Sequence, residues 1–139
     1  MGIAAEVYSA PSWPMLRRDA LAVDRWNRLH PTDKARVPYV ATVLGPKGGP
    51  IVAASDWMKA LPDLVRPWVD APFETLGTDG FGRSDTRDSL RAWFEIDPPS
   101  IAAAAVSALA RAGEITAAAA TKAFADLGID PEKADPLEV

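Results

Sequence analysis

A glycine-rich stretch near the middle of the chain holds the residues whose types and spacing could do chemistry. Gly77, Gly80 and Gly82 fall within six positions, after a short strand-like run and before a polar segment that favours a helix start. Backbone amides at such a helix start can bind phosphate. In open α/β sheets, a turn at the carboxyl end of a strand is also the common place for a ligand or a partner. The stretch is therefore a candidate contact site.

Acidic residues in and after this turn bear on whether it binds phosphate or contacts a protein partner. Asp79, Asp85 and Asp88 make the turn acidic, although Arg83 and Arg87 could pair with them locally. A surface ion pair of this kind contributes at most about 1 kcal/mol. A structural turn or a docking edge is therefore the preferred interpretation, and a phosphate site is the less favoured one.

His30 is the only histidine and the obvious candidate for a general acid or base. It precedes Pro31 at the expected end of a helix, which favours a structural role as a helix cap. One histidine, scattered carboxylates and no cysteine give no metal-ligand spacing. We therefore expect no catalytic, cofactor-binding or metal-binding residue in the chain.

Five tryptophans in 139 residues point to another kind of function, which is protein–protein contact. Trp57 and Trp68 flank a proline-rich connection that also contains Arg66, and tryptophan and arginine are the residue types that most often anchor interfaces. The tryptophans on helices are expected to pack internally. The predicted interface residues come from this connection and from the glycine turn: Trp57, Arg66, Trp68, Asp79, Phe81 and Arg83.

Three strand-like segments must position these residues. Residues 3–9 alternate apolar and polar positions, residues 51–54 are a continuous apolar run, and residues 73–76 lead into the glycine turn. Capping residues and apolar spacing predict helices at 13–29, 38–44, 56–61, 85–94, 98–112 and 117–127. Strands alternating with helices, followed by a helical end, predict one α/β domain over residues 1–139 with a small, mainly parallel sheet. Whether residues 128–139 pack on the domain or form a loose tail is left open.

Composition excludes several classes of protein. A hydrophobic share of 48% with 24% charged residues indicates a globular chain. The net charge of −4 argues against a nucleic-acid partner, because binding a polyanion needs a concentrated basic face. The longest apolar run, residues 101–110, is too short and too polar to span a bilayer, so no membrane association is expected. No signal-peptide pattern is seen and cysteine is absent, so we expect a cytoplasmic protein.

Five sequence motifs lie one after another along the chain. The longest is TLGTDGFGRSDTR at residues 75–87, which precedes an alanine-rich helix. Four others lie at residues 25–31, 36–41, 55–59 and 66–69. Together they closely resemble the C-terminal end of the homodimeric-type pyruvate dehydrogenase first component. The glycine-phenylalanine-glycine turn also resembles the transketolase C-terminal domain.

The resemblance implies an enzyme that uses thiamine diphosphate and magnesium to decarboxylate pyruvate, and that passes the acetyl group to a lipoyl carrier. Family members bind that cofactor between two other domains, and a third, three-layer C-terminal domain serves packing and subunit contact. The chain resembles this third domain without its first strand and helix. Asp79-Gly80 is not the family's metal motif, because no paired asparagine follows. The implied partners are the cofactor-binding domains or subunits, with a homodimer left open, and the chain alone is expected to be inactive.

Two alternatives stay open at this point. One is a subunit of a split transketolase-like enzyme that acts on another 2-oxo acid or on a ketose. The other is a small ligand-binding or regulatory module that uses the glycine turn.

Overall fold

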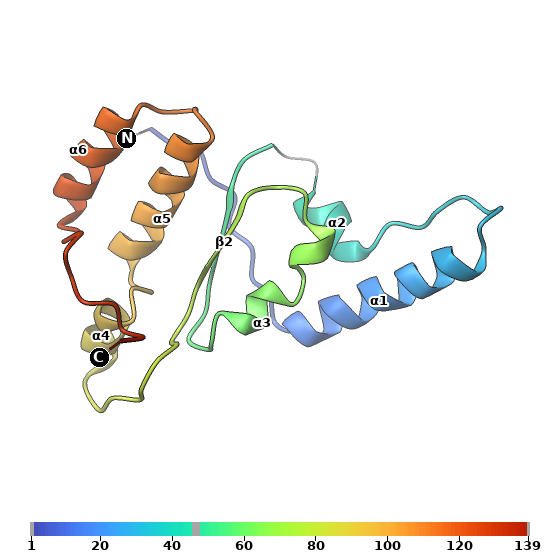
Figure 1. Cartoon of the computed structure of the whole chain (residues 1–139), viewed down its shortest axis with the longest axis horizontal. Helices are drawn as coiled ribbons and strands as arrows, with labels where there is room; N and C mark the ends of the chain where they lie inside the picture. Colours follow the sequence, from blue (N-terminus) through green and yellow to red (C-terminus); the bar gives the residue numbers. More distant parts are fainter. Residues whose placement is uncertain (1, 46–47, 139) are drawn as a thin grey trace. The chain divides into compact units, whose positions relative to one another are not determined.

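The computed structural model describes residues 2–45 and 48–138, which form two compact units (Figure 1). The first unit comprises Met1–Gly48 and Ala60–Ala71, and the second comprises Gly49–Lys59 and Pro72–Val139. The single domain expected over residues 1–139 stays a prediction. Among the described residues, no helix has the length and apolar character that a membrane crossing requires.

Helix α1 (Trp13–Leu29) is the main element of the first unit. Ser12 caps its start, because its Oγ accepts a hydrogen bond from the backbone N–H of Met15 at 3.3 Å. Pro14 lies in the first turn, where a missing N–H leaves no intrahelical bond unmade. Ala20 is fully buried, and Val23 is half-buried on the same face. The predicted bounds of this helix are confirmed.

Three shorter helices complete the first unit: α2 (Tyr39–Leu44), α3 (Ala60–Asp63) and the 3-10 helix η1 (Arg66–Trp68). Helix α1 packs against α2 and α3. The largest fully buried side chains in the described part of the chain are Val40, Pro62 and Val65, all of them in this unit. Its core is therefore built from small apolar groups.

Asn27 fixes the segment that leads from α1 to α2. Its side-chain amide donates to the carbonyl oxygen of Arg36 at 2.9 Å, and its Oδ1 accepts from the N–H of Arg36 at 2.8 Å. Asn27→Ala removes both bonds and is expected to lower the free energy of unfolding by about 1–2 kcal/mol. Urea denaturation measures this change. Asn27→Asp keeps the acceptor and should lose about half as much, so equal losses in the two variants would contradict this account.

The second unit contains the sheet, in which β1 (Ile51–Ala54) and β2 (Phe73–Leu76) pair in parallel. Ile51 lies opposite Phe73. The predicted parallel sheet and the bounds of both strands are confirmed. The strand predicted at residues 3–9 is wrong, because residues 2–10 form no strand. Alternation alone does not make a strand, which also needs a neighbour that completes its hydrogen-bond ladder.

Three helices follow the sheet: α4 (Arg87–Trp93), α5 (Pro98–Arg111) and α6 (Ala117–Leu127). The side chains of Thr86, Asp97 and Thr116 each accept a backbone hydrogen bond at the start of the helix that they cap. The predicted starts of α5 and α6 are confirmed. Helix α4 starts two residues later than predicted, because Thr86 is its cap and Asp85 binds the backbone N–H of Thr86.

Helices α5 and α6 run side by side in opposite directions, and α5 packs on the sheet (Figure 1). Val106, Ala120 and Ala123 are buried between the two helices. Small alanine side chains let the two backbones approach closely. Gly128 ends α6 with φ 71°, a left-handed conformation that glycine adopts without strain. The predicted end of this helix is confirmed.

Candidate functional site

Two loops meet at the carboxyl edge of the sheet: residues 55–59 after β1 and residues 77–85 after β2. Thr78 donates its N–H to the carbonyl oxygen of Trp57 at 3.0 Å and its Oγ1 to that of Asp56 at 3.1 Å. Asp79 Oδ2 accepts from the N–H of Lys59 at 2.7 Å. These three bonds join the segments into one structure, which we call the paired loops.

The paired loops also explain why one predicted helix is wrong. A helix was predicted at residues 56–61, but α3 begins at Ala60. Ser55 Oγ accepts from the N–H of Trp57, and the backbone of Trp57 and Lys59 bonds to the second loop. Bonds across the sheet edge therefore replace those of a helix.

Close backbone approach accounts for two of the three glycines in the turn. A Cβ on buried Gly77 would lie 2.5 Å from the carbonyl oxygen of Trp57. Gly80 has φ 109°, and a Cβ there would lie 2.4 Å from the carbonyl oxygen of Pro136. A Cβ on Gly82 would have no described atom within 4 Å. Two glycines thus serve packing against protein backbone, so no ligand is needed to explain them.

Four of the predicted interface residues lie in the paired loops. Trp57 is 69% exposed and Phe81 is 78% exposed. Asp79 is half-buried and holds Lys59 through the bond described above. Arg83 lies with its guanidinium 3.7 Å from the centroid of the Trp93 ring. The two aromatic side chains therefore face solvent, whereas Asp79 and Arg83 bind within the unit.

Arg66 and Trp68, the other two predicted interface residues, lie in η1 of the first unit. Arg66 pairs with Asp63 at 2.7 Å, and Trp68 donates its indole N–H to Asp24 at 2.8 Å. Both side chains thus have partners in their own unit. The tryptophans predicted to flank one surface connection fall in different units, and their interface role stays a prediction.

His30 caps the end of α1, as the sequence predicts. Its backbone N–H donates to the carbonyl oxygen of Asn27, and its ring stacks on Trp26 with centroids 4.5 Å apart. Its Nδ1 lies 2.8 Å from the carbonyl oxygen of Trp26. Since a carbonyl oxygen only accepts, Nδ1 carries a proton. The predicted helix cap at His30 is confirmed.

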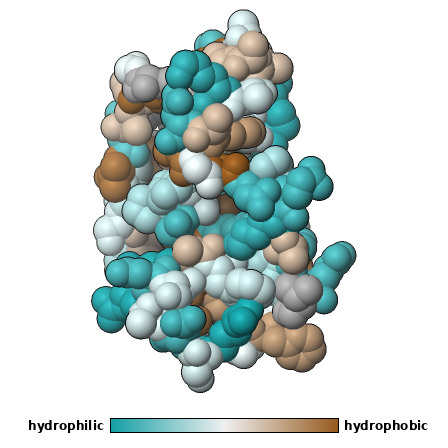
Figure 2. Space-filling model, turned by 90° about the vertical axis from the view of Figure 1, so that its left-hand side faces the viewer, coloured by the Kyte–Doolittle hydropathy of each residue, from teal (hydrophilic) through white to brown (hydrophobic). Residues whose placement is uncertain are grey.

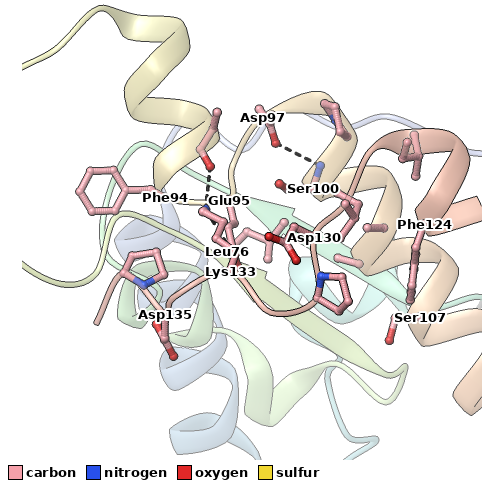
Figure 3. A pocket seen from close by; sticks show the side chains of 18 of the residues that line it. Leu76, Phe94, Glu95, Asp97, Ser100, Ser107, Phe124, Asp130, Lys133 and Asp135 are labelled. Atoms are coloured by element: carbon pink, nitrogen blue, oxygen red, sulfur yellow. Dashed lines mark hydrogen bonds and ion pairs between the residues drawn. The ribbon is translucent and has the colours of Figure 1, made fainter. Parts of the chain in front are cut away.

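A pocket of about 710 Å³ lies beside the paired loops (Figure 3). Its charged lining includes Glu95, Asp97 and Lys133. Asp97 accepts from the N–H of Ser100, and Lys133 faces Glu95 at 3.2 Å. The ammonium of Lys133 also donates to the carbonyl oxygens of Ala92 and Trp93, at 2.9 and 2.7 Å. These groups are therefore engaged in structural bonds.

Sequence reasoning missed Lys133. It lies in the segment that the sequence left open as a loose tail, and it joins that segment to the end of α4. A cation at a helix C-terminus interacts favourably with the helix dipole. The available signal was a lysine in an otherwise acidic stretch, but it does not identify the carbonyl oxygens that the lysine binds.

Lys133→Met is expected to lower the free energy of unfolding by about 2 kcal/mol, because two carbonyl oxygens lose a charged donor. Lys122→Met is the matched control. Its ammonium pairs with exposed Asp126, a contact worth about 0.5 kcal/mol. Chemical denaturation of both variants measures the difference, and equal losses would show that Lys133 does not anchor the C-terminal segment.

The described residues do not fit a magnesium–diphosphate site. Magnesium requires several oxygen ligands in near-octahedral geometry. Among residues 2–45 and 48–138, no three His, Cys, Asp or Glu side chains come together as a metal-binding group. The same residues contain no buried polar side-chain atom that lacks a hydrogen-bond partner. No catalytic step can therefore be assigned to this chain through such a group.

Comparisons with known proteins agree with the resemblance described in the sequence analysis. Residues 1–97 match the family described as transketolase-like TK C-terminal domain. The chain is 49% identical to the pyruvate dehydrogenase E1 component of Pseudomonas aeruginosa over 99% of its length. It is 44% identical to that of Mycolicibacterium smegmatis over 92%, and 43% identical to that of Escherichia coli over 97%. The matched region is 16%, 14% and 15% of these three relatives, respectively.

Proposed function

This chain belongs to the transketolase-like C-terminal domain family, and we propose that it is the C-terminal domain of a thiamine diphosphate-dependent pyruvate dehydrogenase E1 component. The observation that carries the proposal is identity of 38% to 49% with E1 components over nearly the whole chain. The resemblance of its motifs to that enzyme family supports the same assignment. The enzyme would be cytoplasmic, in keeping with a chain that has no cysteine.

The role proposed for this chain is assembly, with catalysis elsewhere in the enzyme. The full enzyme would use thiamine diphosphate and magnesium to decarboxylate pyruvate and pass the acetyl group to a lipoyl carrier. Since the described residues here do not fit that cofactor, other domains or subunits of the enzyme would bind it. The chain would contribute a folded surface that those parts contact, including Trp57 and Phe81.

Reconstitution tests this proposal. The purified chain is assayed alone, and after mixing with the polypeptide that carries the cofactor-binding domains, for pyruvate-dependent reduction of ferricyanide with thiamine diphosphate and magnesium present. We expect background activity from the chain alone, co-elution of the two polypeptides, and higher activity in the mixture. Activity of the chain alone would overturn the assembly role, and absence of any association would overturn the assignment.

The family match by itself also fits a second candidate, a subunit of a split transketolase-like enzyme. The same reconstituted mixture distinguishes the two. Pyruvate as the best substrate supports the first assignment. Another 2-oxo acid or a ketose phosphate as the best substrate supports the second.

A further inference from the structure

The exposed hydrophobic side chains of the second unit are concentrated at one place. Among its described residues, every large hydrophobic side chain that is exposed belongs to the paired loops or to the C-terminal segment beside them. These side chains are Trp57 at 69%, Met58 at 55%, Phe81 at 78% and Leu137 at 52% exposure. Leu137 belongs to this group because its Cα lies 3.5 Å from the position of a Cβ on Gly80. We call these four residues the apolar edge.

Outside the apolar edge, the described residues of the second unit expose no large hydrophobic side chain. Figure 2 shows the side on which α5 and α6 lie, where hydrophilic and hydrophobic residues are interspersed. Single exposed hydrophobic residues are normal on protein surfaces, whereas gathered ones mark contact sites. The concentration of four at the sheet edge therefore indicates a contact surface.

The backbone under the apolar edge is held in place before any partner arrives. Three hydrogen bonds join the two loops, and Gly77 and Gly80 allow direct backbone approach on both sides of the turn. A surface whose backbone is already fixed loses less conformational freedom when it binds. Tryptophan, phenylalanine and methionine on such a base are the residue types enriched in interface cores.

Three charged groups in the paired loops have contacts within the second unit. Asp56 pairs with Arg91 at 3.3 Å, Asp79 binds the N–H of Lys59, and Arg83 lies on Trp93. These three charged groups have partners within the unit, whereas the side chains of the apolar edge itself are hydrophobic. The surface that matches this edge is an apolar one.

We propose that the apolar edge docks against an apolar surface of the cofactor-binding part of the same enzyme. This inference rests on the proposed function. The matched relatives support this choice of occupant, because this chain covers only 14% to 16% of three of them. Most of each such enzyme therefore lies outside the region seen here and is available to cover the edge.

Binding measurements on substituted chains test the inference. Trp57→Ser and Phe81→Ser change exposed side chains, and both variants are titrated by calorimetry with the polypeptide that carries the cofactor-binding domains. Each substitution is expected to raise the dissociation constant about tenfold or more, because aromatic side chains buried in an interface often contribute that much to binding. Met15→Ser and Val37→Ser are the matched controls, because these side chains are 61% and 65% exposed in the first unit. The controls should bind as the unsubstituted chain does.

The outcomes distinguish a failure of the inference from a failure of the function on which it rests. If the unsubstituted chain binds and the edge variants bind equally well, the docking surface is wrong and the assignment stands. If the unsubstituted chain does not bind, both fail. A second copy of the chain is the other possible occupant, and sedimentation of the chain alone tests for it. A dimer that forms in the unsubstituted chain and is lost in Trp57→Ser and Phe81→Ser would overturn the proposal.

Discussion

Replacing Gly80 by alanine is expected to lower the free energy of unfolding by about 3 kcal/mol. Two costs add at this position. The backbone has φ 109°, where an L side chain is strained, and the new Cβ would lie 2.4 Å from the carbonyl oxygen of Pro136. Since the opposing atom is backbone, no side-chain rotation relieves the clash. Urea denaturation followed by circular dichroism measures the loss.

Two other glycines separate these costs. Gly128→Ala carries the strain alone, because φ is 71° and no described atom lies within 4 Å of the new Cβ; it should cost about 1 kcal/mol. Gly82→Ala has neither problem and should be neutral or stabilising by about 0.5 kcal/mol. A loss at Gly80 no larger than that at Gly128 would show that the C-terminal segment does not pack on the turn.

Gly77→Ala should have an effect of similar size, about 2–3 kcal/mol, from steric conflict alone. The new Cβ would lie 2.5 Å from the carbonyl oxygen of Trp57 and 2.7 Å from the N of Lys59. The paired loops would have to separate, and the bonds of Thr78 and Asp79 across them would break. Thermal and urea denaturation both measure this loss.

Thr78→Val provides the control for Gly77→Ala. It removes one hydroxyl donor without adding volume and should cost about 1 kcal/mol. A Gly77→Ala variant as stable as the unsubstituted chain would mean that the two loops are not in close backbone contact.

Local signals made much of the fold predictable. The bounds of α1 and α6 follow from Ser12 and Thr116 at their starts and from His30 and Gly128 at their ends. The strand at residues 51–54 was visible as a short apolar run, and the strand at residues 73–76 lies between Pro72 and the glycine turn, which mark its ends. In each case the deciding interactions join residues close in the chain, so the sequence contains them directly.

Long-range bonds account for the errors. Residues 3–9 alternate as a strand does, but pairing depends on a neighbour that the alternation does not identify. The helix predicted after Ser55 is displaced because the backbone of that segment bonds to Thr78 and Asp79, 20 or more residues away. Lys133 was missed for the same reason, since its acceptors lie 40 and 41 residues before it.

The sequence identified residue types that can form a contact site, but it did not show which of those residues are available for contact. Trp57 and Phe81 were chosen as contact residues, and both are exposed in the structure. Trp68 was chosen on the same grounds, but its indole binds Asp24. Composition identifies side chains able to anchor an interface, and only the fold shows which of them already have an internal partner.

The two-stranded sheet has a practical consequence for handling the protein. Within the described part of the chain, β1 and β2 are each edge strands, and alternate backbone groups of Val52 and Ala54 point away from β2. Such an open margin can pair with another molecule and cause precipitation. We therefore expect solutions of the isolated chain to become turbid as concentration rises, and co-expression with the proposed partner polypeptide to keep them clear.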